Sequence, residues 1–341
     1  MIAARIGRKF PSGFSLDAEF SAAPGVTVLY GPSRAGKTLL LEMLAGFAAP
    51  DSGRILLGDA LLFDADTRVH VPVCRRGCAY VAGRDALFPH MTLRRNLLFA
   101  AHRSPRVERS RRVAEMLERF QIAALAASRP RNLEPRDSLR GEVARTLLAS
   151  PKALLLDERG YGEALLRLIR ETFPGPILLV SSDLDLCCAA DRMILLNAGR
   201  IVQSGPPRDV LDRPESADAA RLLGIPNIFE CVIAALDPGR GSSRLELPGF
   251  ALNGPYVPGH FRGDRVSVAV DPANLRVHSG DTERHPNAVP ATLVRAVPRA
   301  RTVRLEFSGG VFVDVPNEEF ERRKDNRTWQ VEFPPQALRV L

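Results

Sequence analysis

The sequence predicts an α/β domain with a mostly parallel sheet and a helical subdomain, followed by small β-barrel units in tandem. An apolar, β-branched run at residues 26–30 leads through a glycine-bearing loop into an apolar helical segment at 39–45. Further short apolar runs at 153–156 and 176–180 are separated by a segment with helical spacing, which is typical of a parallel sheet. Past about residue 215 the pattern changes to short alternating strands with Gly and Pro turns, which indicates an all-β region.

Length and composition favour a soluble globular protein of about two domains. The chain has 341 residues, of which 45% are apolar and 25% charged. No apolar run reaches the roughly 18–20 residues that a membrane-spanning helix needs. The first nine residues lack the apolar core of a signal peptide. We therefore expect the protein to stay inside the cell unless a partner tethers it.

The charge is basic but dispersed. The net charge is +8, carried mostly by arginines along the whole chain, and aromatic residues make up only 6%. Without aromatics among the arginines there is no stacking surface for bases, so we expect no nucleic-acid partner. The five cysteines form no C-x-x-C pair and no zinc-like spacing, which predicts reduced thiols.

The loop after the first apolar run carries a phosphate-binding pattern. It matches G-x-x-x-x-G-K-[ST] with Gly31, Pro32, Ser33, Arg34, Ala35, Gly36, Lys37 and Thr38. The two glycines allow the main chain to wrap closely around phosphate at a helix N-terminus. Lys37 would reach the outer phosphates, and the Thr38 hydroxyl suits Mg²⁺. The alternative is an ordinary strand-to-helix turn in which Lys37 is a surface charge.

A second apolar run supplies the acidic half of such a site. The strand expected at 153–156 ends in Asp157 and Glu158. Asp157 would hold Mg²⁺ through water, and Glu158 would polarise the attacking water. Many strands end in acids, so this pair is informative only together with the loop.

Taken in order, the motifs resemble the ATP-binding subunit of an ABC transporter. They lie at residues 31–38, 87–90, 147–151, 154–158 and 191–201. The Leu-Phe-Pro-His run at 87–90 is most similar to molybdate and related anion or iron importers. The resemblance implies a P-loop NTPase fold and ATP and Mg²⁺ as cofactors, with Lys37 and Glu158 in catalysis. It also implies adenine stacking on Phe10, although a core phenylalanine is an alternative reading of that residue.

The same resemblance implies partners and a location. It predicts a second ATP-binding subunit, in a homodimer or a heterodimer, and a membrane permease. The protein would then be cytoplasmic and peripheral on the inner face of the cell membrane.

The expected domains are a nucleotide-binding domain at 1–215, with a helical subdomain at about 86–150, and two β-barrel units at 216–280 and 281–341. The division into two β-barrel units is inferred from an internal repeat, in which residues 268–277 align with residues 331–340. Asn227 and Asn287 begin a strand upstream of each copy. The units resemble oligonucleotide-fold accessory domains of the TOBE type, and they could bind a ligand or only pack and dimerise.

Several positions depart from the family pattern. Gly83 stands at the glutamine position, Ser182 at the histidine position, and residues 159–162 lack the expected Pro and Asp. Arg34 replaces the third glycine of the loop, where it could brace a phosphate or strain the main chain.

The signature loop, whose main chain closes on the other subunit's nucleotide, is also altered. We place it at residues 137–142, where Gly141 and Glu142 fit the pattern best. The resemblance assigns nucleotide contact there to Ser138, Gly141 and Glu142.

We therefore expect Mg-ATP binding to be retained and hydrolysis to be weakened in an importer's energy-coupling subunit. One alternative is a non-catalytic nucleotide-binding subunit that regulates or pairs with an intact partner. Another is an oxyanion-binding or sensing protein that acts through the tandem β units. The sequence does not identify the transported substrate.

Overall fold

The computed structural model describes residues 1–341 except 83–85, 104, 158–159, 280–286 and 325–327, so Gly83 and Glu158 lie outside the described residues. The chain divides into two compact units, Met1–Val210 and Leu211–Leu341, each described below by itself. The division lies five residues before the boundary expected from the sequence, at about 215.

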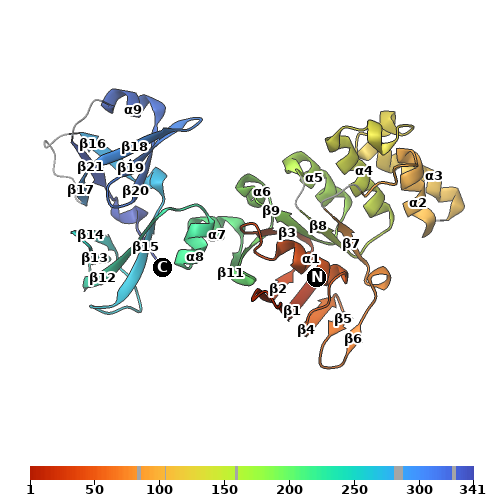
Figure 1. Ribbon diagram of the computed structural model, residues 1–341, viewed down its shortest axis with the longest axis horizontal. Helices are drawn as coiled ribbons and strands as arrows, with labels where there is room; N and C mark the ends of the chain where they lie inside the picture. Colours follow the sequence, from red (N-terminus) through yellow and green to blue (C-terminus); the bar gives the residue numbers. More distant parts are fainter. Residues whose placement is uncertain (83–85, 104, 158–159, 280–286, 325–327) are drawn as a thin grey trace. The chain divides into compact units, whose positions relative to one another are not determined.

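In the described part of the first unit, eleven strands form one sheet in the order β6-β5-β4-β1-β2-β11-β10-β3-β9-β8-β7 (Figure 1). In chain order they are β1 (Ile2–Lys9), β2 (Ser15–Ala22), β3 (Gly25–Tyr30), β4 (Ser52–Leu57), β5 (Ala60–Asp64), β6 (Val69–His70), β7 (Cys78–Val81), β8 (Ala153–Leu156), β9 (Pro176–Ser181), β10 (Arg192–Asn197) and β11 (Arg200–Gly205).

The half of the sheet that carries the site is parallel. Strands β10, β3, β9, β8 and β7 run in one direction, and every residue of β8 and β9 is buried, as expected for strands covered on both faces. The α/β prediction is confirmed, but the sheet is mixed: β1, β2, β4, β5 and β6 form an antiparallel arm. The carboxyl ends of β3 and β8 therefore lie at the same edge, where ligands bind in such sheets.

Helices cover the sheet and build a separate cluster. The helices of this unit are α1 (Lys37–Ala45), α2 (Leu93–Ala100), α3 (Arg106–Arg119), α4 (Pro135–Leu148), α5 (Gly162–Thr172), α6 (Leu184–Cys188) and α7 (Pro207–Asp212), the last crossing into the second unit. Helices α2, α3 and α4 pack on one another within the range expected for the helical subdomain. Among the described residues, no helix has the length and apolar character to cross a membrane.

Helix α1 packs against the parallel strands β7, β8 and β9. Its buried Leu40, Leu41 and Leu44 share one apolar cluster with Ile6 of the arm and Leu178 of β9. The start of α1 is consequently held rigidly against the sheet that carries the acidic side chain.

The second unit is rich in strands, with short helices at its edges. Its elements are α8 (Ala217–Leu222), β12 (Asn227–Asp237), β13 (Ser242–Leu247), β14 (Phe250–Pro255), β15 (Arg265–Val270), β16 (Arg276–Ser279), β17 (Ala288–Ala291), β18 (Leu293–Pro298), β19 (Thr302–Phe307), β20 (Val311–Pro316), α9 (Asn317–Arg323), β21 (Trp329–Glu332) and β22 (Arg339–Val340). They form sheets ordered β14-β13-β12-β15-β22, β16-β21-β17 and β18-β19-β20.

The two repeats of this unit exchange strands. The end of the first repeat, β16, pairs with β21 of the second, and the end of the second, β22, pairs with β15 of the first. The pairs are reciprocal in the repeat register, Val277 with Val331 and Val340 with Val268. One apolar cluster contains residues from both repeats. This differs from barrels that follow one another along the chain with a boundary at 280.

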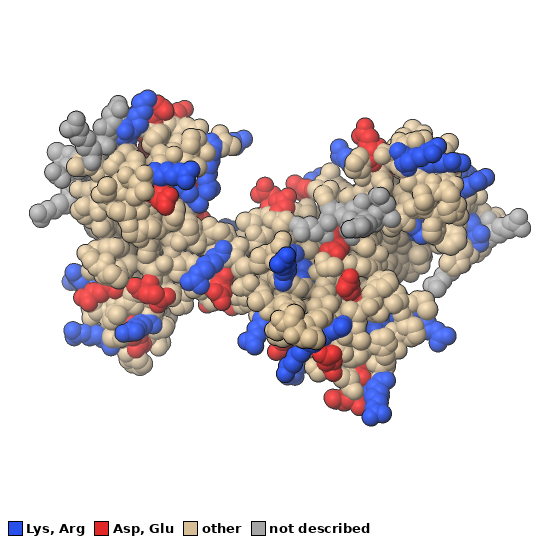
Figure 2. Space-filling model, viewed as in Figure 1, with Lys and Arg blue, Asp and Glu red and all other residues tan. Residues whose placement is uncertain are grey.

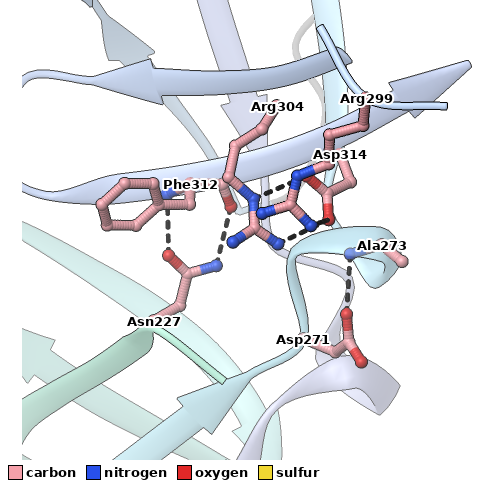
Figure 3. A network of polar contacts seen from close by, with 7 residues as sticks. All are labelled: Asn227, Asp271, Ala273, Arg299, Arg304, Phe312 and Asp314. Carbon is pink, nitrogen blue, oxygen red and sulfur yellow. Dashed lines mark hydrogen bonds and ion pairs between the residues drawn. The ribbon is translucent and has the colours of Figure 1, made fainter. Parts of the chain in front are cut away.

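Two buried asparagines fasten this exchange. The Asn227 amide pairs with the main chain of Phe312, with both bonds at 2.7 Å (Figure 3). The Asn287 amide accepts from the Asn253 N–H at 2.7 Å and donates to the carbonyls of Asn253 and Phe333 at 2.6 and 2.9 Å. Each asparagine thus bonds the main chain of the other repeat, which explains why both strands begin with this residue type.

Charged side chains lie mainly at the surface. On the face seen in Figure 2, basic and acidic side chains are interspersed. A more buried ion pair joins Arg304 to Asp314 through two bonds of 2.7 and 2.6 Å, with Arg299 3.9 Å from the same carboxylate (Figure 3). The bonds to Asp314 raise the pKa of Arg304, so this guanidinium stays charged.

Candidate functional site

The phosphate-binding loop joins β3 to α1, and its glycines are required by space and by conformation. A Cβ at Gly31 would lie 2.1 Å from the Leu196 carbonyl oxygen, so no larger residue fits. Gly36 has φ +103°, which L side chains rarely adopt, and it is the residue before the first turn of α1. The loop therefore places main-chain N–H groups at a helix N-terminus, where anions are favoured.

Lys37 folds over this loop. Its ammonium donates to the carbonyls of Gly31 and Pro32 at 2.7 and 3.0 Å, and the residue is only 8% exposed. A surface lysine would not be held in this way, so the structure does not support the alternative in which Lys37 is only a surface charge. The Lys37 charge is held against the carbonyls of the first two residues of the loop.

The second half of the site lies beside the first turn of α1. The Thr38 hydroxyl donates to one oxygen of Asp157 at 3.1 Å, and Asp157, directly after β8, is 7% exposed. Because a hydroxyl has one hydrogen and two lone pairs, donation to Asp157 leaves the Thr38 oxygen free to ligate a cation. The Tyr80 hydroxyl donates to the other Asp157 oxygen at 2.9 Å.

The far end of α1 is also fixed. The buried Arg76 guanidinium donates to the Met43 and Leu44 carbonyls at 2.7 and 3.0 Å, and to the Val71 carbonyl at 2.8 Å. A cation at a helix C-terminus interacts favourably with the helix dipole. Burial lowers the pKa of Arg76, but an arginine remains charged at neutral pH.

A cavity of about 630 Å³ adjoins the loop. It is lined by Phe10, Ser12 and Phe14 on one side and by the segment 33–39 on the other. The ring of Phe10 is partly exposed, lies 5.9 Å from that of Phe14, and carries the Arg8 guanidinium 4.7 Å from its centroid. Phe10 borders the cavity beside the loop, as a residue that stacks on a base must.

Arg34 adopts the left-handed conformation, with φ +65°. A non-glycine residue in this region is uncommon and carries a steric cost of about 1–2 kcal/mol. Its side chain lines the cavity. The main chain is therefore strained at this position, and bracing of a phosphate by the Arg34 side chain stays a prediction.

The placement of the signature residues is corrected by the structure. Ser138, Gly141 and Glu142 lie inside α4, buried, and Glu142 is 0% exposed. A Cβ at Gly141 would lie 2.7 Å from Leu93 Cδ1, so this glycine permits α4 to pack closely on α2. Their main chain is engaged in the helix and cannot be offered to a nucleotide.

Other positions of interest lie near the sheet edge. Ser182 is exposed directly after β9, and the Ser181 hydroxyl accepts from the Asp183 N–H at 3.0 Å. Gly83, Glu158 and Arg159 lie outside the described residues. In the second unit, the Asn287 amide is engaged by the main chain, which is a structural use.

Sequence reasoning missed Tyr80 and the first turn of α4. Tyr80 was only part of an expected strand, because nothing in the local pattern indicates a partner 77 residues away. The Pro135 at the start of α4 was a usable signal, since proline favours the first turn of a helix.

The geometry fits a nucleoside triphosphate with a hard cation. The oxygen donors are Thr38 Oγ1, which would ligate Mg²⁺ directly, and the Asp157 carboxylate, which would hold it through water, and Mg²⁺ takes one or two protein groups plus phosphate and water. Among the described residues, no group of three or more His, Cys, Asp or Glu side chains could by itself hold a metal ion.

Sequence comparisons agree with this site. The sequence profile described as ABC transporter matches residues 17–159. The chain is 35% identical over 243 residues to the molybdenum import ATP-binding protein ModC of Rhodospirillum rubrum, covering 68% of this chain and 66% of that protein. It is 31% identical over 309 residues to the ModC of Paramagnetospirillum magneticum, covering 85% of this chain and 83% of that protein.

Comparison with solved structures shows the fold. A structure described as an ATP-binding subunit of an ABC transporter superposes with a TM-score of 0.54 at 21% identity, covering 66% of this chain and 99% of that chain. The cbiO1 structure from Clostridium perfringens, part of an ABC transporter complex, gives 0.52 at 21% identity, covering 65% and 94%.

Proposed function

The chain belongs to the ABC transporter family as an ATP-binding subunit of the importer type, and from this premise we propose that it binds Mg-ATP strongly, hydrolyses it slowly, and serves the uptake of molybdate or a similar small oxyanion. As a member of this family it is an ABC-type ATPase, whose hydrolysis of ATP is coupled to transport. The proposal concerns its substrate, its rate and its partners.

One observation carries the binding part of the proposal: Lys37, Thr38 and Asp157 converge at the start of α1. Lys37 supplies the charge for the outer phosphates, and the loop N–H groups surround them. Thr38 and Asp157 would hold Mg²⁺, which when bound neutralises charge on the phosphates. Phe10 at the cavity edge would stack on the base. Glu158 is the residue proposed to polarise the attacking water.

Slow hydrolysis is supported by the first turn of α4, which we take as the segment that closes on the other subunit's nucleotide, in place of the buried residues 138–142. A segment that offers main-chain N–H groups to phosphate must lie where these groups are still unbonded, as at a helix start. Here Pro135 has no N–H, and those of Asp137 and Ser138 donate to the Glu134 carbonyl at 3.0 and 2.9 Å. The carboxylate of Glu134 also repels phosphate, whereas that of Asp137 lies 3.7 Å from the Arg140 guanidinium. This turn is a poor cover for the other subunit's nucleotide.

The oxyanion assignment and the partners rest on the relatives. Both ModC proteins are described as acting in molybdenum import. A permease contact is supported by an aromatic cluster on the helical subdomain: Phe88 packs on the exposed Phe99 at 5.0 Å, and the Arg145 guanidinium lies 4.3 Å above the Phe88 ring. Bound to a permease and a second ATP-binding subunit, the protein would lie on the inner face of the membrane.

The same α4 turn also favours a second candidate, a nucleotide-binding subunit that pairs with an intact ATPase, whose own segment would then cover this chain's nucleotide. The two candidates differ in assembly. A purified homodimer with measurable Mg-ATP turnover supports the first, whereas turnover that requires a second, different ATP-binding subunit supports the second.

The test of binding is thermal unfolding with and without Mg-ATP. At about 100 times the dissociation constant, ATP should stabilise the protein by about 2.7 kcal/mol. Lys37→Ala should abolish this gain by removing the phosphate charge, whereas the exposed Lys152→Ala should keep it. Absence of stabilisation in the unmodified chain would contradict the proposed function.

A further inference from the structure

We propose that Tyr80 is a positioning residue of the magnesium site, whose hydroxyl fixes the orientation of the Asp157 carboxylate so that it accepts the cation without rearrangement. The proposal rests on the proposed function, because it assumes that Thr38 and Asp157 hold Mg²⁺.

The first observation is that both oxygens of Asp157 are held, each by a different hydroxyl. Thr38 donates to Oδ1 at 3.1 Å and Tyr80 to Oδ2 at 2.9 Å. Rotation of the carboxylate about its last torsion would break both bonds. Such terminal torsions are otherwise broad, so a carboxylate held by one bond would have more freedom.

The second observation is that the three residues come from three elements. Thr38 lies in the first turn of α1, Tyr80 in β7, and Asp157 directly after β8. Strands β7 and β8 are paired in parallel register, with Tyr80 opposite Leu155 and Val81 opposite Leu156. The strand register therefore fixes the position of the Tyr80 hydroxyl relative to the Asp157 carboxylate. The packing of α1 on the sheet fixes the position of the Thr38 hydroxyl relative to the same carboxylate.

The direction of the Tyr80 bond follows from the chemistry of its two partners. The phenol hydroxyl carries the hydrogen and donates it to Asp157 Oδ2 at 2.9 Å, and the carboxylate oxygen accepts. This donor stabilises a carboxylate that is buried and would otherwise lose solvation.

The ring of Tyr80 is held as well as its hydroxyl. The Phe47 ring lies 5.7 Å from it at an interplanar angle of 48°, and Phe47 itself follows α1 and is 62% exposed. A side chain held by a ring contact and by a hydroxyl bond has little freedom of its own. Mutation of a residue that orients a metal ligand in this way typically lowers metal affinity by about 10–100-fold.

The experiment compares the Mg²⁺ requirement of the full-length wild-type chain with that of Tyr80→Phe. The variant removes only the hydroxyl and keeps the ring that contacts Phe47. Isothermal titration gives ATP affinity at a series of free Mg²⁺ concentrations and in EDTA. We expect half-saturating Mg²⁺ to rise about 10-fold, with the affinity for ATP in EDTA unchanged. Tyr256→Phe, which removes a hydroxyl in the second unit, should leave both values unchanged.

Two results would overturn the positioning role. One is a Mg²⁺ requirement of Tyr80→Phe within about twofold of wild type. The other is an equal loss of ATP affinity with and without Mg²⁺, which would indicate a general structural defect. These results are distinct from failure of the proposed function, in which the wild-type chain itself shows no Mg²⁺-dependent ATP binding and both proposals fall.

Discussion

The ring of Phe10 illustrates how single residues define the candidate site. It borders the cavity beside the loop rather than lying in the core, where its neighbour Phe14 packs on the buried cluster. The Arg8 guanidinium lies over the Phe10 ring. This position requires the space around the ring to admit a charged group. The position suits a flat apolar surface on which a base stacks.

At this scale we predict that Phe10→Ala weakens ATP binding by about 1–3 kcal/mol, the range found for base stacking on an aromatic side chain. The measurement is isothermal titration with Mg-ATP. The exposed Phe261→Ala, in the second unit, serves as the control and should bind as wild type does. Unchanged affinity together with a lower melting temperature would instead show that Phe10 is a packing residue.

At the scale of single elements, the first turn of α4 is the part proposed to slow ATP hydrolysis while ATP binding at α1 is retained. Its proline lacks a donor and its Glu134 carboxylate opposes phosphate, whereas Lys37 and Thr38 lie at the start of α1 beside Asp157. A charge-stabilising donor is worth about 10²–10³ in rate, so one defective turn can slow hydrolysis without affecting nucleotide affinity.

We therefore predict that the double substitution Glu134→Ser and Pro135→Gly raises steady-state phosphate release by about 10-fold or more, because it restores a main-chain donor and removes a charge. Ser182→His alone should give a smaller increase, since the α4 turn remains defective. Glu115→Ser, on the exposed face of α3, is the control. A full recovery with Ser182→His alone would contradict the assigned role of α4.

Sequence patterns predict the local parts of this molecule and fail where distant segments meet. Residues 31–38 and the strand before Asp157 are continuous motifs, so the fold class, the loop and the acid were predictable. Gly141 was predicted to lie in a loop. The reason for a glycine at this position is the close approach of Leu93, which belongs to another helix and is not visible in the local sequence. The bond from Tyr80 to Asp157 depends on strand register, and the strand exchange of the repeats depends on tertiary pairing.

At the scale of the whole molecule, the second unit depends on contacts between its repeats. Strands β16 and β22 each complete a sheet of the other repeat, and the apolar cluster spans both. The two repeats should therefore unfold together. The single tryptophan, Trp329, is buried in this cluster 5.9 Å from the Phe307 ring and reports its unfolding.

We predict that Asn287→Ala lowers the stability of the second unit by about 1–3 kcal/mol, because it leaves the buried Phe333 carbonyl and the part-buried main-chain groups of Asn253 without their bonds. Denaturant unfolding of the full chain, followed by Trp329 fluorescence, measures the loss. Asn253→Ala changes an exposed side chain of the same type and should shift stability by less than about 0.5 kcal/mol. Equal effects of the two substitutions would contradict the fastening role of Asn287.

The central claim, that Mg-ATP binding is retained while turnover is slow, is tested most directly by steady-state phosphate release from the purified chain at saturating Mg-ATP. We predict a rate well below the common enzymatic median of about 10 s⁻¹. Slow release with saturated binding would support the separation between the intact loop at α1 and the defective turn at α4. Release at about 10 s⁻¹ or faster would contradict the account, because the α4 turn and Ser182 would then not limit hydrolysis.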